Sequence, residues 1–186
     1  MPRIHILGAS GSGVSTLGAV IADLLSAPHL DADTVYWRPT DPPFVEARPR
    51  AERLALLCEL LPAAGCWVFS GSAIGWAAAL ESSYDLIVYL RLDPAIRMDR
   101  LRRREQARYG RRIEPGGDMA ATNAAFLAWA AVYDTAGAEQ RSRVAHEEWL
   151  AARATPILRL DSSEPVDVLA SAVLSKVKAS GLRHSN

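Results

Sequence analysis

A glycine-rich stretch near the N-terminus, GASGSGVST at 8–16, places the strongest constraint on what this chain folds into. It stands between an apolar run at 3–8, RIHILG, and a segment with helical periodicity at 15–27. Its glycine and serine spacing fits the phosphate-binding pattern G-x-x-x-x-G-K-[ST], which requires this strand, loop and helix context. The lysine position holds Val14. The sequence therefore predicts an anion-binding loop of backbone N–H groups that lacks its usual side-chain cation.

Apolar runs alternate with helical segments along the rest of the 186 residues, a length that predicts a single domain over 1–186. The apolar runs cover 29–33, 66–72, 84–93 and 155–161, and the helical segments cover 50–63, 94–110, 120–137, 139–152 and 166–180. Four prolines between residues 38 and 49 predict a surface loop. Such alternation predicts a parallel sheet that is covered by helices on both faces.

Composition argues against a nucleic-acid or membrane surface. Lys+Arg 21 balances Asp+Glu 21, and the N-terminal apolar run is too short for a signal peptide or a membrane span. We therefore expect a cytoplasmic protein, a monomer or weak homodimer, that binds small molecules and neither nucleic acid nor membrane. Cys58 and Cys66 have no metal-ligand spacing, so we expect two reduced packing residues.

The carboxyl ends of the predicted strands bring polar residues to one crevice, where ligands bind in parallel α/β sheets. Gly8, Asp31, Ser70 to Ser72 and Asp161 all follow strand ends. Ser15 occupies the hydroxyl position that ligates magnesium, and Thr16 can reach a neighbouring phosphate oxygen. Val14 keeps its backbone N–H, so phosphate binding should survive its substitution better than catalysis.

Arginines supply a candidate for the missing cation. Only Lys176 and Lys178 are lysines, whereas residues 91 to 112 contain nine arginines against three acids. On a helix, Arg97, Arg100, Arg104 and Arg108 share one face, which favours an anion-facing stripe because arginine donates bidentately to phosphate. A coding bias towards arginine and a solvated helix face are the alternatives.

Two acids after the second strand, Asp31 and Asp33, are candidates for holding a magnesium water and for orienting or deprotonating an acceptor hydroxyl. The alternative is a helix cap in a polar turn. Tyr36, Trp37 and Trp76 offer aromatic faces on which a planar base could stack, and core packing is an equal alternative for each.

These motifs together resemble the small P-loop kinases of the nucleoside monophosphate kinase and shikimate kinase type. The resemblance is closest to the bacterial adenylate kinase-like branch that includes DNA topology modulation proteins. It rests on GASGSGVSTLG, HLDADTVYW, WVFSGS, DLIVYLRLD, RLRRREQARYG and LRLD, and it covers nearly the full chain. It implies a three-layer α/β fold of the P-loop NTPase class, with a five-stranded parallel sheet and a helical lid.

The same resemblance implies where substrates bind. Residues 8–16 would bind the triphosphate of ATP, and residues 34–49 would form the acceptor-site flap. The lid would comprise residues 104–122, including Arg111 and Arg112. The loop from Asp161 to Pro165 would lie under the adenine. The third strand ends in FSGS and lacks the acid that many P-loop enzymes carry there. Kinases of the shikimate type likewise have small residues at this point.

The resulting hypothesis is transfer of the γ-phosphoryl of Mg-ATP to a small acceptor, first of all a nucleoside monophosphate. The alternatives are a nucleotide-binding module with little or no phosphotransfer, and a small hydroxy acid or sugar acid as acceptor. The predicted cofactors are ATP and Mg2+. The predicted site comprises catalytic Asp33, Arg104 and Arg108; nucleotide-binding Gly8, Ser10, Gly11, Ser12, Gly13, Val14, Ser15, Thr16, Arg104, Arg108 and Ser162; acceptor-binding Asp33, Tyr36, Arg38, Ser72 and Trp76; and metal-binding Ser15 and Asp31.

Overall fold

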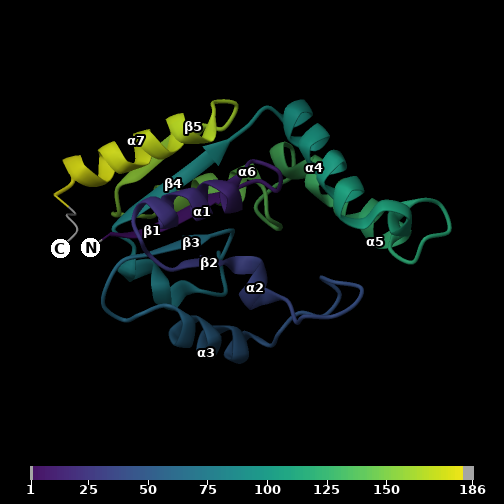
Figure 1. The fold of residues 1–186 in the computed structure, drawn as a ribbon, viewed down its shortest axis with the longest axis horizontal. Coiled ribbons are helices and arrows are strands. Elements are labelled where there is room, and N and C mark those ends of the chain that lie inside the picture. The colour runs from purple at the N-terminus through teal and green to yellow at the C-terminus, as the bar shows by residue number, and fades with distance from the viewer. Residues whose placement is uncertain (1, 182–186) are drawn as a thin grey trace.

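The chain is built around a five-stranded sheet, seen in a computed structural model that describes residues 2–181. All neighbouring strands are parallel, in the order β2-β3-β1-β4-β5 (Figure 1). The strands are β1 (Arg3–Gly8), β2 (His29–Asp31), β3 (Trp67–Ser70), β4 (Leu86–Arg91) and β5 (Ile157–Asp161). The predicted five-stranded parallel sheet is therefore confirmed.

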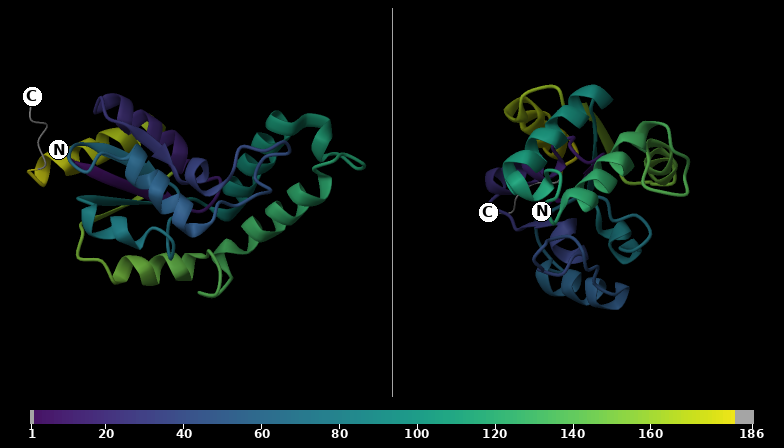
Figure 2. Two further views of the ribbon diagram at one scale, coloured as in Figure 1. Left: turned by 90° about the horizontal axis from the view of Figure 1, so that it is seen from below. Right: turned by 90° about the vertical axis from the view of Figure 1, so that its right-hand side faces the viewer.

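Helices cover both faces of this sheet. α1 (Val14–Leu24) and α7 (Val166–Ala179) pack on one face, and α2 (Ala32–Tyr36), α3 (Arg50–Leu60) and α6 (Arg143–Ala151) lie on the other. α4 (Pro94–Tyr109) and α5 (Ala120–Ala131) extend beyond the carboxyl edge of the sheet, where the strand arrows point (Figures 1 and 2). Short 3-10 turns, η1 (Ala78–Ser83), η2 (Gly110–Ile113) and η3 (Val132–Asp134), complete the described chain.

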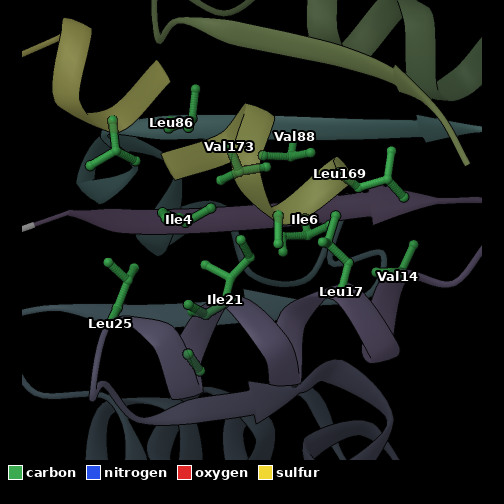
Figure 3. Close-up of a cluster of buried hydrophobic side chains, with 14 of the residues drawn as sticks. Ile4, Ile6, Val14, Leu17, Ile21, Leu25, Leu86, Val88, Leu169 and Val173 are labelled. Atoms are coloured by element: carbon green, nitrogen blue, oxygen red, sulfur yellow. The ribbon is translucent and has the colours of Figure 1, made fainter. Parts of the chain in front are cut away.

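Apolar side chains on both faces of the sheet explain why its strands read as continuous hydrophobic runs. Ile4 and Ile6 of β1 point towards α1 and α7, where they meet residues such as Leu17 and Val173 (Figure 3). Leu7, on the opposite face, joins a second cluster with residues of α3 and α6. The sheet is thus fixed between two apolar layers, and its polar loops are left at the carboxyl edge.

Local capping explains where several elements begin. Asp93 accepts hydrogen bonds from the N–H groups of the first turn of α4, and Pro94 opens that helix as expected. The second strand is shorter than predicted. It stops at Asp31, whose side chain accepts a hydrogen bond from Asp33 N at 2.9 Å and thereby starts α2. Asp31 therefore caps α2, a role that the sequence also allowed, and it lies at the end of β2.

The proline-containing segment after α2 folds back on itself. Trp37 and Ala47 form an isolated antiparallel bridge, and Arg38 N donates to Glu46 O at 2.8 Å. This confirms that residues 38 to 49 contain no helix and only this bridge.

Two further features concern sequence expectations. Cys66 is buried as expected, whereas Cys58 is exposed on α3, so the expectation that it packs in the core is wrong. No helix within residues 2–181 combines the length and apolar character needed to cross a membrane.

Candidate active site

A cavity of about 670 Å³ opens at the carboxyl edge of the sheet. Its walls are the glycine-rich loop with the start of α1, the ends of β2 and β3, the inner face of α4, and the loop between β5 and α7. Its polar and charged lining includes Ser10, Ser12, Ser15, Thr16, Asp31, Asp33, Ser72, Arg100, Arg104, Arg108, Arg141, Ser162, Ser163 and Glu164. The structure thus brings together the predicted loop, both acids and three of the four arginines of the predicted stripe.

The glycine-rich loop has the backbone shape of an anion cradle. Gly11 and Gly13 both have φ of +85°, a left-handed conformation that glycine adopts without strain. A Cβ at Gly11 would lie 2.9 Å from the carbonyl oxygen of Arg97, so the loop also packs tightly on α4. Ser12 Oγ donates to Ala9 O at 2.8 Å and closes the loop. The loop's conformation therefore depends on these glycines.

The start of α1 supplies free donors to this cradle. Gly13 occupies the N-cap position, and no side chain caps the helix. The first N–H groups of a helix have no intrahelical partner, and they carry the positive end of the helix dipole. Ser15 and Thr16 expose their side chains beside these donors. This arrangement suits a phosphate group.

Val14 does not replace the lysine that the pattern expects. Its side chain is 9% exposed and belongs to the apolar cluster between the sheet, α1 and α7, near Leu169 (Figure 3). It also forms part of the cavity wall where that cluster reaches the loop. The loop therefore keeps its backbone donors and has an apolar contact in place of a mobile charge.

Arg141 brings a positive charge to the loop from the segment between α5 and α6. Its guanidinium donates to Ser10 Oγ and lies 4.6 Å from the centre of the Trp129 ring, a cation–π contact that fixes its orientation. Burial lowers its pKa, and the Asp33 carboxylate opposes this effect. The side chain still carries its charge at neutral pH, since arginine is not deprotonated in proteins. Arg141 thus places a positive charge beside the loop, whose own sequence contains no basic residue.

The arginines of α4 do not all face the cavity. Arg97, expected in the anion-facing stripe, is instead buried, pairs with Asp134 at 3.1 Å and donates to Ala130 O at 2.9 Å. It holds α4 to the end of α5 and does not line the cavity. The stripe is wrong at this position because Arg97 faces the packed side of α4.

Two other α4 arginines already have protein partners. Arg100 donates to Ser162 O at 3.1 Å, and Arg104 pairs with Glu105 at 2.8 Å. Arg108 lines the cavity, with its guanidinium 5.8 Å from the ring of Phe44 on the 38–49 segment. α4 therefore contributes a positive wall, and Arg112 beyond it pairs with Asp41 of the 38–49 segment and with Asp118.

The two carboxylates lie in different environments. Asp31 accepts hydrogen bonds from Asp33 N and from Ser70 Oγ, at 2.9 and 3.2 Å, which fixes both of its oxygens. Ser70 in turn lies 2.9 Å from His29 Nε2. Because the single Ser70 proton goes to Asp31, the His29 ring must donate from Nε2. This chain orients Asp31 towards the cavity edge.

Asp33 has a raised pKa. Its side chain is exposed to the cavity, yet the surrounding walls limit its hydration, and its pKa is raised by this desolvation and by the Asp31 charge. Arg141, Arg104 and Arg108 lower the pKa without reversing the shift. A carboxylate with a raised pKa facing three guanidinium groups is a good proton acceptor for a hydroxyl group bound there.

The residues expected to bind the acceptor do not all reach the cavity. Ser72 lines it, whereas Trp76 is buried in the core and Tyr36 stacks under Arg53, at 3.7 Å from ring centre to guanidinium carbon. Arg38 forms ion pairs with Glu46 and Glu52 on the surface. The cavity lining within residues 2–181 contains no aromatic side chain.

At the other end, the loop after β5 offers an unused polar group. Ser162 is 3% exposed, and its hydroxyl oxygen has no hydrogen-bond partner among the described residues. A buried hydroxyl without a partner is unfavourable unless a ligand completes it. The Ser162 hydroxyl is therefore a candidate contact for a ligand at this end of the cavity.

The residues fit a magnesium ion that takes most of its ligands from substrate phosphates and water. Residues 2–181 hold no group of three or more His, Cys, Asp or Glu side chains suited to a metal. Mg²⁺ commonly takes one or two protein oxygens together with substrate phosphates and water. The Ser15 hydroxyl and the oriented Asp31 carboxylate supply oxygens of this kind on the cavity wall.

Sequence reasoning missed Arg141 because no motif surrounds it. The dense arginines of α4 drew attention, whereas Arg141 stands in a loop, TAGAEQRS at 135–142. The helix expected at 139–152 would have contained Arg141, whereas α6 begins at Arg143, because Ser142 caps it by accepting from Ala145 N at 3.0 Å. Its approach to Ser10, 131 residues away, depends on the tertiary fold.

Comparison with known proteins places these features in context. No protein-family model matches the sequence. YqaC of Bacillus subtilis (strain 168), described as an uncharacterized protein, is 43% identical over 159 residues, which cover 86% of this chain and 88% of YqaC.

Solved structures share the fold at low identity. One is a gluconokinase from Sinorhizobium meliloti 1021, with a TM-score of 0.56 and 15% identity over 96% of this chain and 92% of that one. Another is a shikimate kinase from Bacteroides thetaiotaomicron, with a TM-score of 0.55 and 16% identity over 95% of this chain and 98% of that one. A third is a deoxyadenosine kinase from M. mycoides with bound dATP, with a TM-score of 0.56 and 13% identity over 95% of this chain and 99% of that one. The fold is that of the small-molecule P-loop kinases, which confirms the predicted fold class.

Proposed function

The chain belongs to the family of Bacillus subtilis YqaC, and from the geometry of its cavity we propose that it transfers the γ-phosphoryl group of Mg-ATP to a small acceptor. One observation carries this proposal: a backbone anion cradle, a guanidinium held against it and a carboxylate with a raised pKa share a single cavity. Phosphoryl transfer depends mainly on positioning and charge stabilisation, which these groups supply.

The glycine-rich loop would hold the phosphate chain through the N–H groups at the start of α1. Arg141 would neutralise phosphate charge where the lysine is missing, since arginine matches phosphate geometry with paired donors. Ser15 and Asp31 would hold magnesium, which supplies neutralisation of the phosphate oxygens when bound. Ser162 and the neighbouring loop would contact the base.

On the acceptor side, Asp33 would orient a hydroxyl group and take its proton. A nucleoside monophosphate, the first expectation from the sequence, presents an ionised phosphate oxygen that needs no base and that a carboxylate repels. Tyr36 and Trp76, the expected stacking faces, lie outside the cavity. Both observations favour a small acceptor with a hydroxyl group and an anionic group, such as a hydroxy acid or sugar acid.

The test is a coupled assay for ADP with Mg-ATP and a panel of acceptors. The panel contains hydroxy acids, sugar acids, nucleosides and nucleoside monophosphates. We expect acceptor-dependent ADP formation with an anionic hydroxy compound, and loss of that activity in Asp33→Asn. Asp23→Asn, an exposed acid on α1 outside the cavity, is the matched control.

A nucleotide-binding module without phosphotransfer is the second candidate, which the buried position of Val14 favours. It predicts saturable Mg-ATP binding with no acceptor-dependent ADP across the whole panel. Binding without turnover would therefore replace the kinase proposal, and turnover with a nucleoside monophosphate alone would restore the first expectation for the acceptor.

A further inference from the structure

A series of hydrogen bonds between buried side chains ends at Ser72 in the lining of the cavity. Ser72 Oγ lies 3.2 Å from His146 Nε2, and His146 Nδ1 lies 2.7 Å from the hydroxyl oxygen of Tyr133. That hydroxyl is 3.0 Å from the hydroxyl of Tyr89. His146 is fully buried, Tyr133 and Tyr89 are also buried, and Ser72 is the member of the chain that faces the cavity. The phosphotransfer proposal above gives the two tyrosines and the histidine no role.

The turn before Ser72 fixes its place. Gly71 has φ of +102°, and a Cβ there would lie 2.7 Å from Ala32 Cβ. The chain therefore turns sharply after β3, and it places Ser72 on the same wall as Asp33. Ser72 therefore follows a turn that packs against Ala32, the residue next to Asp33.

The imidazole of His146 is neutral. Burial lowers its pKa to about 3, and the positive charge of Arg141 acts in the same direction. A neutral imidazole has one donor and one acceptor nitrogen, so the proton on one side of the ring determines the role of the other side. Burial and Tyr89 raise the pKa of Tyr133, so its hydroxyl also keeps its proton.

Geometry selects one of the two possible directions. In the opposite direction Nδ1 would donate to Tyr133 and Tyr133 would donate to Tyr89, and the proton of the buried Tyr89 hydroxyl would have no acceptor among the described residues. Tyr133 therefore donates to Nδ1, and the ring proton lies on Nε2. The 3.2 Å contact is then an N–H donated to Ser72 Oγ. This leaves the Ser72 proton unused by the protein.

We propose that Tyr133 and His146 are positioning residues that present the Ser72 hydroxyl to the cavity as a hydrogen-bond donor. Ser72 then selects an oxygen that only accepts, a carboxylate or phosphate oxygen of the acceptor molecule. Arg108 in the lining of the same cavity supplies a matching positive charge. The assignment of Ser72 to the acceptor rests on the proposed phosphotransfer, whereas the direction of the hydrogen bonds does not.

The direct test is the tautomer of His146, read by long-range ¹H–¹⁵N NMR of the uniformly ¹⁵N-labelled full chain at neutral pH, with His146→Gln used to assign the signals. We expect a neutral ring protonated at Nε2. In Tyr133→Phe, which removes the donor to Nδ1, we expect the Nδ1-protonated form to gain population. A wild-type ring protonated at Nδ1 would overturn the proposal, and this result needs no enzymatic activity.

Kinetics test the consequence for the acceptor. In Ser72→Ala and in Tyr133→Phe, we expect KM for the anionic acceptor to rise by about tenfold with kcat changed less than threefold, because a lost bond to a charged group weakens binding. The double variant should show no further rise. Tyr89→Phe should stay within twofold of the wild type, since Tyr133 can still donate to His146.

Variants at the histidine separate positioning from packing. The amide of His146→Gln can still donate towards Ser72, so its acceptor KM should stay closer to wild type than that of His146→Leu. Equal losses in these two variants, or additive effects of Ser72→Ala and Tyr133→Phe, would contradict the proposal. If no acceptor on the panel is phosphorylated, the phosphotransfer proposal fails while the NMR result still decides the hydrogen-bond direction.

Discussion

Replacing Arg141 with alanine removes the guanidinium of the cavity lining that donates to the Ser10 hydroxyl of the glycine-rich loop. The wild-type side chain donates to Ser10 Oγ, stacks on Trp129 at 4.6 Å and acts electrostatically on Asp33. Three quantities should therefore change in Arg141→Ala: nucleotide affinity, turnover and the fluorescence of Trp129. The backbone cradle itself should persist, because its shape depends on Gly11 and Gly13.

The size of the loss follows from the kind of contact. A hydrogen bond to a charged group contributes about 1.5–3 kcal/mol, which corresponds to roughly 10- to 150-fold weaker binding of Mg-ATP. Loss of a donor that faces the developing transition-state charge lowers kcat by about 100- to 1000-fold. Stability should change by no more than about 1–2 kcal/mol, because losing the Trp129 contact is offset by removing a buried guanidinium whose Nε has no partner.

Isothermal titration with Mg²⁺ and a non-hydrolysable ATP analogue measures the binding loss, and the ADP assay measures turnover. Arg143→Ala is the matched control, because this exposed arginine lies two residues away and outside the cavity. Near-wild-type affinity and turnover in Arg141→Ala would refute the assignment of the missing charge to this residue.

Restoring the lysine gives a complementary experiment. Val14 is buried yet reaches the cavity wall, so a lysine there can extend its amine into the cavity at a cost of about 1–3 kcal/mol in packing. Val14→Lys should therefore lower stability and partly recover the kcat of Arg141→Ala. A double variant no faster than Arg141→Ala would show that the two positions do not serve the same phosphate.

Three further predictions concern the loop, the base site and the acid. Gly11→Ala should lower the free energy of unfolding by about 2–4 kcal/mol in urea, more than Gly13→Ala, since both have positive φ but only Gly11 meets backbone at 2.9 Å. Ser162→Ala should weaken nucleotide binding without lowering stability, because its hydroxyl has no partner in the free protein; a stability loss in urea without a change in affinity would contradict this. The raised pKa of Asp33 means that its ionisation is disfavoured in the folded state, so kcat/KM should fall as the pH drops through this pKa, which lies above the ordinary value of 3.8. Asp33→Asn should therefore raise the melting temperature at pH 7, and it should also abolish turnover. An unchanged or lower melting temperature in Asp33→Asn would contradict the sign of this shift.

Local patterns in the sequence predicted the elements that build the cavity. The glycine spacing, the apolar runs and Pro94 follow from backbone preferences and burial within short windows, and each reappears in the structure as β1, the loop and the start of α4. Likewise, the convergence of strand ends follows from a parallel sheet, since its carboxyl edge is shared.

Side-chain direction could not be read in the same way. Helical spacing put Arg97 and Arg108 on one face, but α4 packs part of that face against α5, so Arg97 is buried and Arg108 is not. Arg141 and Ser10 are brought together by the path of the chain through α5 and α6. A residue's distance along the sequence gives no information on contacts of this kind.

Binding of Mg-ATP to the wild-type chain tests the account's central claim most directly, because the cradle and Arg141 are proposed to hold the triphosphate without a lysine. At a nucleotide concentration about 100-fold above Kd, binding adds roughly 2.7 kcal/mol to stability and raises the melting temperature by about 5–10 °C. We expect this rise with Mg-ATP and a clearly smaller one in Arg141→Ala. No shift of the wild-type melting temperature at millimolar Mg-ATP would contradict the account.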